Sequence, residues 1–74
     1  MEKNAFDYSK LRGRIVEKGY SQQKLAKILG ISMQAFSKKM RNTTRFSSDD
    51  IIKLVDVLEI HPEEIGAYFF TLSV

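Results

Sequence analysis

The sequence contains no cysteine, one proline and one histidine. Without cysteine, neither a disulfide nor a thiolate metal site can brace the chain, and a single histidine argues against a zinc site. No apolar run approaches the roughly 18 residues that a membrane-spanning helix needs. The first ten residues, MEKNAFDYSK, also lack the apolar segment of a secretory signal. We therefore expect a cytoplasmic protein with no membrane contact.

The chain has 74 residues, which suits one small domain and leaves no room for a two-lobed catalytic cleft. Its one cluster of acid–base groups is His61 with Glu63 and Glu64. The start of a helix explains this cluster better than catalysis does, because carboxylates favour the positive end of a helix. We predict a single domain over residues 1–74 that is not an enzyme and needs no cofactor or metal.

Charge is divided unevenly along the chain, although the net charge is only +3. Residues 1–47 hold eleven Lys and Arg against three acids, whereas residues 48–74 hold one Lys and six acids. This asymmetry is typical of a protein with one face for an anion such as nucleic acid, but ordinary solvated faces also produce it. Charge by itself does not choose between the two interpretations.

Apolar residues recur every three or four positions, which predicts helices along most of the chain. Ser21, Ser32 and Ser47 each precede such a segment and are preferred N-caps, and Pro62 suits the first turn of another helix. The expected helices cover residues 7–18, 22–29, 33–41, 48–58 and 62–68. The predicted core consists of Leu11, Ile15, Leu25, Ala26, Ile28, Leu29, Ile31, Phe36, Met40, Phe46, Ile51, Leu54, Val55, Leu58 and Ile65. The predicted fold class is all-α, a bundle of five helices.

The segment QQKLAKILGISMQAFSKKM, residues 22–40, predicts two helices joined by a short turn. Gly30 suits the left-handed conformation that ends a helix, and Ile31 can then enter the core. Ala26 is small where the second helix must cross the first, and Phe36 faces the core from the second helix. Two helices with such a turn form a helix-turn-helix, although an ordinary helical hairpin is the alternative. The spacing and the positive charge favour the DNA-binding motif.

This segment resembles the helix-turn-helix of the phage Cro/repressor (XRE-type) family. The resemblance covers about residues 8–66 and includes the continuation NTTRFSSDDIIKLVDVLEIHPEEI, residues 42–65. The chain length is also similar to that of short Cro-like members. The resemblance implies a repressor-like bundle and a regulator that binds double-stranded DNA sequence-specifically. Such a phage or prophage repressor would occupy promoter DNA in the cytoplasm of a bacterial host.

The polar face of the second helix of the motif is expected to read bases, because the major groove admits an α-helix. Gln34 can pair both amide atoms with adenine, and the resemblance implies a base contact at this position. Lys38 lies one turn further on the same face and is expected to reach guanine or phosphate, and Ser37 can donate to either. Met33 is expected to pack on a thymine methyl or to touch only the DNA backbone, and the sequence leaves both open.

Further residues around the motif are expected to bind phosphate. Gln22 opens the first helix of the motif, where free backbone N–H groups attract phosphate, and the resemblance supports this role. The loop RNTTR, residues 41–45, is small, polar and cationic, and its last residue is also placed to reach a narrow minor groove. The predicted phosphate-binding residues are Gln22, Ser32, Lys39, Arg41, Asn42, Thr43 and Arg45. A plain solvated loop is the alternative for residues 41–45.

The tail, residues 67–74, is unusually apolar for a solvated end. Phe70, Leu72 and Val74 alternate with polar residues, which predicts a short half-buried strand. One hypothesis is that Tyr68, Phe69, Phe70 and Leu72 form a homodimer contact. A two-fold homodimer would suit a palindromic operator, as in family members. The alternative is that the tail folds back over its own core.

A second function from another class is a protein–protein adaptor or antirepressor on the same scaffold. An adaptor is expected to present an apolar second helix in the motif, whereas this one presents amides and amines. The sequence shows no site for a small-molecule effector. DNA binding is therefore the preferred interpretation.

Overall fold

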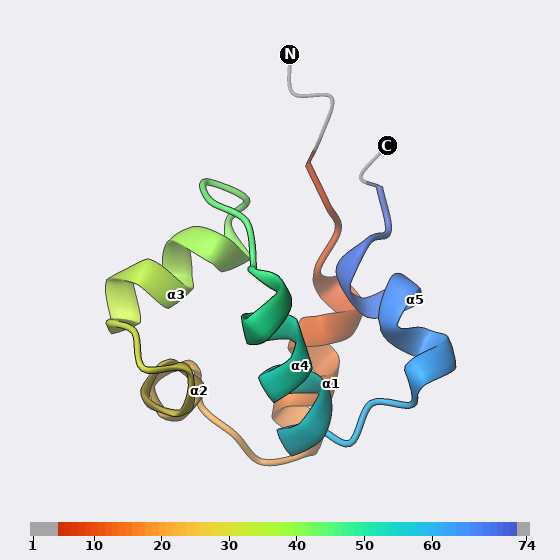
Figure 1. The fold of residues 1–74 in the computed structure, drawn as a ribbon, viewed down its shortest axis with the longest axis horizontal. Coiled ribbons are helices and arrows are strands. Elements are labelled where there is room, and N and C mark those ends of the chain that lie inside the picture. Colours follow the sequence, from red (N-terminus) through yellow and green to blue (C-terminus); the bar gives the residue numbers. More distant parts are fainter. Residues whose placement is uncertain (1–4, 73–74) are drawn as a thin grey trace.

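The computed structural model describes residues 5–72, and these residues form a small helical bundle (Figure 1). The elements are α1 (Ser9–Glu17), α2 (Gln22–Leu29), α3 (Met33–Met40), α4 (Ser48–Val57), the 3-10 helix η1 (Pro62–Glu64) and α5 (Ile65–Phe69). None of these helices is long and apolar enough to cross a membrane. The predicted all-α class with five helices is confirmed.

The helix starts are built by the serine caps that the sequence predicts. The side chains of Ser21, Ser32 and Ser47 each accept a hydrogen bond of 3.0 Å from the backbone N–H three residues later. The carboxylate of Asp50 also accepts from the N–H of Ser47, which completes a capping box at α4. Gly30 ends α2 with φ of 74°, a left-handed conformation that strains any residue with a Cβ. Local sequence therefore defines the α2–turn–α3 unit at both of its junctions.

Several helix bounds differ from those predicted. The first helix begins at Ser9, because the carboxylate of Asp7 accepts the N–H of Ser9 and forms a turn ahead of it. The last predicted helix is divided into the 3-10 turn η1 and the short helix α5, which ends at Phe69. The helices α1, α3 and α4 each end one residue earlier than expected.

The buried apolar side chains of residues 5–72 form one continuous core. Its members are Tyr8, Leu11, Ile15, Leu25, Ala26, Leu29, Phe36, Met40, Leu54, Leu58, Ile60, Tyr68 and Phe69. The sequence-based core lacked Tyr8, Ile60, Tyr68 and Phe69, all of which are buried. Six residues predicted as core are only half-buried at its edge: Ile28, Ile31, Phe46, Ile51, Val55 and Ile65.

The two ends of the described chain lie next to each other (Figure 1). Phe6 and Leu72 form an isolated antiparallel bridge, and the N–H of Asp7 donates to the carbonyl of Thr71 at 2.8 Å. The predicted C-terminal strand is therefore reduced to one bridge within the chain, and α5 packs against α1. Val74, the last residue of the predicted alternation, lies outside the described residues.

Candidate functional site

The α2–turn–α3 unit presents α3 at one edge of the molecule, on the side opposite α5 (Figure 1). Phe36 is fully buried and anchors the inner face of α3 to the core. The N–H of Ile31 donates to the carbonyl of Ala26 at 3.0 Å, which folds the turn back onto α2. The outer face of α3 is thereby held at the surface by a buried aromatic ring and a tight turn.

The predicted base-reading residues lie together on this outer face. Gln34 and Lys38 are exposed, and Met33 is 46% exposed at the start of the helix. Ser37 is half-buried, and its hydroxyl accepts a hydrogen bond of 2.6 Å from the guanidinium of Arg41. Gln34, Ser37, Lys38 and Arg41 line one shallow hollow. The structure thus gathers an amide, a hydroxyl and two cations in a single open site.

Electrostatics favour an anion at this surface. The sequence has no acidic residue between Glu17 and Asp49, and the same stretch carries seven Lys and Arg, of which Lys18 and Lys39 form ion pairs with Glu59 and Asp50. On α2, Lys24 and Lys27 are exposed and line a second hollow with Ser21 and Gln23. Lys24 and Lys27 are not among the predicted site residues, although the absence of acids along the stretch is a sequence signal for a cationic surface.

Lys39 is engaged with other residues of the fold. Its ammonium forms an ion pair of 3.2 Å with Asp50, donates to the carbonyl of Arg45 at 2.9 Å, and lies 6.0 Å from the centre of the Phe46 ring. Only 16% of its side chain is exposed. Partial burial acts to raise the pKa of Asp50, but hydrogen bonds from Ser47 and Lys39 outweigh it and hold the pKa below its ordinary value. Lys39 therefore joins α3 to α4.

The loop after α3 is also tied to the fold more closely than expected. The carboxamide of Asn42 is bound to the backbone of Phe6, and the Arg45 guanidinium lies over the Phe6 ring, 4.7 Å from its centre. Asn42 has φ of 67°, a conformation that asparagine tolerates better than most residues. Asn42 is thus a structural residue of the loop, while Arg41 and Thr43 remain exposed.

The other two predicted phosphate ligands are at helix starts. Gln22 is the first residue of α2 and is half-buried. Ser32 is exposed, and its hydroxyl accepts the N–H of Ala35 as the cap of α3. His61 similarly caps η1, accepting a long hydrogen bond of 3.4 Å from the N–H of Glu63. The contacts of His61 and Glu63 are therefore those of a helix start.

The predicted dimer residues are divided between core and surface. Tyr68 and Phe69 are 7% and 1% exposed and belong to the chain's own core. Phe70 and Leu72 are 52% and 59% exposed. Of the four predicted dimer residues, the exposed ones are therefore Phe70 and Leu72.

The fold and the site define a small helical protein with an outward-facing, cationic helix in an acid-free segment. The chain belongs to the DUF739 family of proteins of unknown function, whose model matches residues 4–72. It is similar to the solution structure of the modulator of repression (MOR) of the temperate bacteriophage TP901-1 from Lactococcus lactis. The two share 40% sequence identity over 88% of each chain, with a TM-score of 0.73. The sequence matches no curated protein significantly.

Proposed function

We propose that this protein is a phage regulator of transcription that binds double-stranded DNA through the outer face of α3. The observation that carries the proposal is the joint exposure of Gln34 and Lys38 on one helix face, within a segment that has no acidic residue. The similarity to a phage modulator of repression supports a regulatory role. A protein of this kind acts on DNA in the cytoplasm of the bacterial host.

The residues of α3 have distinct roles in this proposal. Gln34 reads adenine through its two amide atoms, and Lys38 contacts guanine or a phosphate. Met33 packs against a thymine methyl or the DNA backbone. Ser37 orients Arg41 through the 2.6 Å hydrogen bond, so that the guanidinium reaches a phosphate beside the reading face.

Residues next to α3 contribute to affinity. Gln22 and the free N–H groups at the start of α2 bind one phosphate, and Thr43 contacts the backbone beyond α3. Lys24 and Lys27 add positive potential beside them, which accelerates association with DNA. Lys39, Asn42 and the hydroxyl of Ser32 hold the reading surface in place without reaching DNA.

The proposal includes two protomers on a palindromic operator. One reading helix spans only a few base pairs, and two-fold pairing of protomers doubles the length of the site. The exposed Phe70 and Leu72 offer an apolar contact for this pairing. A dimer contact at Tyr68 and Phe69 is not part of the proposal, because both are buried.

The test is selection of bound duplexes from a randomised DNA pool at physiological salt. We expect the parent protein to enrich a palindromic consensus, and Gln34→Ala to lose preference at one or two base positions per half-site. Gln23→Ala is the matched control, because it removes the same side chain from an exposed position on α2. If Gln34→Ala and the parent enrich the same consensus, α3 is not the reading helix.

A second candidate is an adaptor that binds a repressor protein through the same face. The similarity to a modulator of repression favours this candidate, as does the exposure of Met33. This candidate predicts that no DNA sequence is enriched and that a repressor protein forms a complex with the chain in light scattering. Gln34→Ala would then weaken that complex, whereas Gln23→Ala would leave it unchanged.

A further inference from the structure

Arg12 of α1 is exposed and lies at the C-terminal end of α3. Its guanidinium donates to the carbonyl of Met40, the last residue of α3, at 3.3 Å. Among residues 5–72 this is the one hydrogen bond of the Arg12 side chain, and no ion pair holds it. Hydrogen bonds from Ser9 lower the pKa of Asp7, and the charge of Arg12 adds only a smaller effect. Because a guanidinium carries several N–H donors, most of this one can bind a group outside the chain.

The other cations of α1 and its C-terminal cap have partners on the opposite side of the helix. Lys10 lies over the ring of Tyr68, 5.0 Å from its centre. Arg14 and Lys18 both bind the chain at the end of α4. Arg12 is thus the cation of this helix that is directed at α3.

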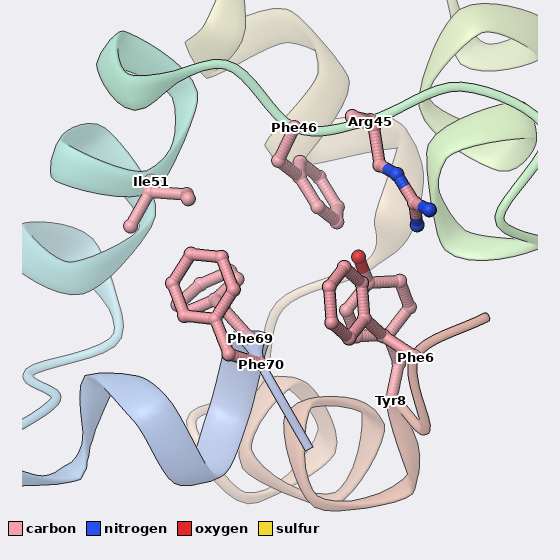
Figure 2. A pocket seen from close by; sticks show the side chains of 7 residues that line it. All are labelled: Phe6, Tyr8, Arg45, Phe46, Ile51, Phe69 and Phe70. Atoms are coloured by element: carbon pink, nitrogen blue, oxygen red, sulfur yellow. The ribbon is translucent and has the colours of Figure 1, made fainter. Parts of the chain in front are cut away.

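The start of α1 is fixed against the loop that follows α3. Asn42 of that loop forms two hydrogen bonds with the backbone of Phe6, and the rings of Tyr8 and Phe46 are 5.5 Å apart in an edge-to-face arrangement. Figure 2 shows the side chains of Phe6 and Tyr8 facing this loop. Arg12 lies one helical turn after Tyr8, because its N–H donates to the Tyr8 carbonyl. The aromatic contacts therefore hold the guanidinium in place beside α3.

The end of α3 needs a cation if it is to lie beside DNA. The C-terminal end of a helix carries a partial negative charge, which repels phosphate. The proposed phosphate ligands Arg41 and Thr43 both follow this end directly. Arg12 covers the carbonyl of Met40 and offsets that negative charge where a phosphate would lie.

We propose that Arg12 is a further phosphate ligand and binds the same phosphate as Arg41 or the next one along the strand. This inference rests on the proposed binding of DNA by α3. It extends the DNA interface from the helix-turn-helix to α1. A guanidinium that holds both the Met40 carbonyl and a phosphate also fixes the angle at which α3 enters the groove, because phosphate contacts set orientation on the duplex.

The experiment measures binding of the whole chain to the duplex that the selection enriches, by fluorescence anisotropy at several salt concentrations. We expect Arg12→Gln to flatten the dependence of log K on log salt by about 0.9, the effect of one lost phosphate contact, and to leave the preferred sequence unchanged. Arg12→Lys keeps the charge and is expected to keep the slope of the parent. Lys10→Gln is the matched control, because it removes one positive charge from the other side of α1.

Methylphosphonate linkages in the same duplex locate the contact, because each removes the charge of one phosphate. The parent is expected to lose affinity when a phosphate bound by Arg12 or Arg41 is neutralised. At one of these positions the loss should disappear in Arg12→Gln and persist in Lys10→Gln. Thermal unfolding of each variant shows that it is folded.

Three outcomes would contradict the inference in distinguishable ways. A parental slope for Arg12→Gln, with a flattened slope for Arg41→Gln, would overturn the role of Arg12 and leave the proposed function standing. Equal losses of affinity for Arg12→Gln and Arg12→Lys at an unchanged slope would show that Arg12 only supports the fold. If the selection enriches no duplex, the proposed function fails and this inference fails with it.

Discussion

The carboxamide of Asn42 is paired with the backbone of Phe6 through two hydrogen bonds of 2.8 Å. Its oxygen accepts the Phe6 N–H, and its nitrogen donates to the Phe6 carbonyl. Asn42 follows α3 directly after Arg41, whereas Phe6 precedes α1. On its other side, Phe6 bridges Leu72. The side chain of Asn42 thus takes the place of a neighbouring strand and ties the end of α3 to both ends of the described chain.

The first prediction concerns this pair. Asn42→Ala removes both hydrogen bonds and also strains the left-handed backbone, so we expect a loss of about 2–3 kcal/mol in the free energy of unfolding. Asn42→Gly removes the hydrogen bonds but relieves the strain, so its loss is expected to be smaller. Urea denaturation of the two variants and the parent measures both losses in the free energy of unfolding. Two variants as stable as the parent would contradict the assigned role of the carboxamide.

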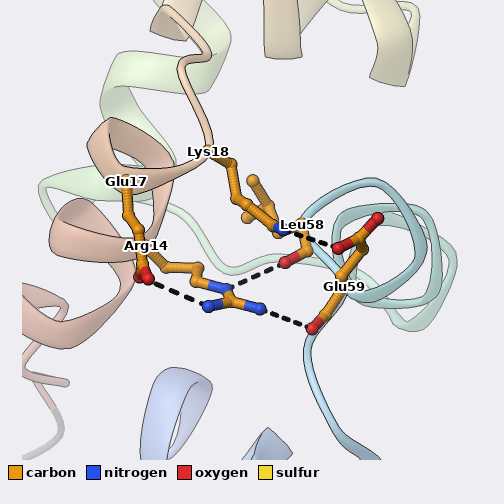
Figure 3. Close-up of polar contacts among 5 residues, drawn as sticks. All are labelled: Arg14, Glu17, Lys18, Leu58 and Glu59. Carbon is orange, nitrogen blue, oxygen red and sulfur yellow. Dashed lines mark hydrogen bonds and ion pairs between the residues drawn. The ribbon is translucent and has the colours of Figure 1, made fainter.

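The second prediction concerns Arg14, whose guanidinium binds the end of α4 (Figure 3). Its Nε donates to the carbonyl of Leu58 at 2.9 Å and its Nη2 to the carbonyl of Glu59 at 2.7 Å. Lysine has no planar fork for two carbonyls, so Arg14→Lys is expected to cost about 1–2 kcal/mol in unfolding free energy. Arg12→Lys is the control, because Arg12 makes a single longer bond of 3.3 Å to Met40. Equal losses for the two would show that the fork is not required.

The third prediction is a pH dependence of stability that arises at Asp50. The pKa of this carboxyl in the folded protein lies below its ordinary value of 3.8. The ionised form is therefore favoured by folding, and its stabilising effect is present above about pH 4 and lost as pH falls through the folded pKa. Urea denaturation between pH 7 and pH 2.5 should show a smaller acid loss for Asp50→Asn than for the parent. If the free energy of unfolding fell in parallel with pH for the two proteins, Asp50 would not contribute to the acid loss of stability.

The fourth prediction couples Asp50 to Lys39. A double-mutant cycle with Lys39→Met and Asp50→Asn is expected to give a coupling of roughly 0.5–1 kcal/mol, because the pair is partly shielded from solvent. Additive losses would mean that the ion pair does not stabilise the fold.

The fifth prediction distinguishes Arg41 from Lys39 in DNA binding. If Arg41 binds a phosphate, Arg41→Gln flattens the dependence of log K on log salt by about 0.9 for that contact. Lys39→Met is expected to leave this slope unchanged, because its ammonium is engaged with Asp50. Fluorescence anisotropy at several salt concentrations measures both slopes. A flatter slope for Lys39→Met would return Lys39 to the phosphate contacts that its position in the sequence predicts.

The predictable part of the fold depends on neighbours in sequence. The serine caps at Ser21, Ser32 and Ser47 act on residues three positions away, and Gly30 acts on its own backbone. These signals are local, so they predict α2, α3 and the start of α4 closely. The gathering of Gln34 and Lys38 on one face follows from helix periodicity in the same way.

What the sequence could not predict depends on residues that are distant along the chain. Lys39 has the pattern of an exposed lysine, and only the folded chain brings Asp50, in the first turn of α4, next to it. Tyr68 and Phe69 look like an apolar tail until α5 is placed on α1. Asn42 looks like a loop residue for the same reason, because its partner Phe6 lies before the first helix.

The bridge between Phe6 and Leu72 has a consequence for the order of folding. Phe6 precedes every helix and Leu72 follows every one, so their contact closes the largest loop in the described chain. Its entropic cost is recovered only after the helices between them have formed. During synthesis, α1 to α4 can assemble before Phe6 and Leu72 come into contact. We therefore expect the contact between the two ends of the described chain to close last, so that a chain that has made it is already folded between them.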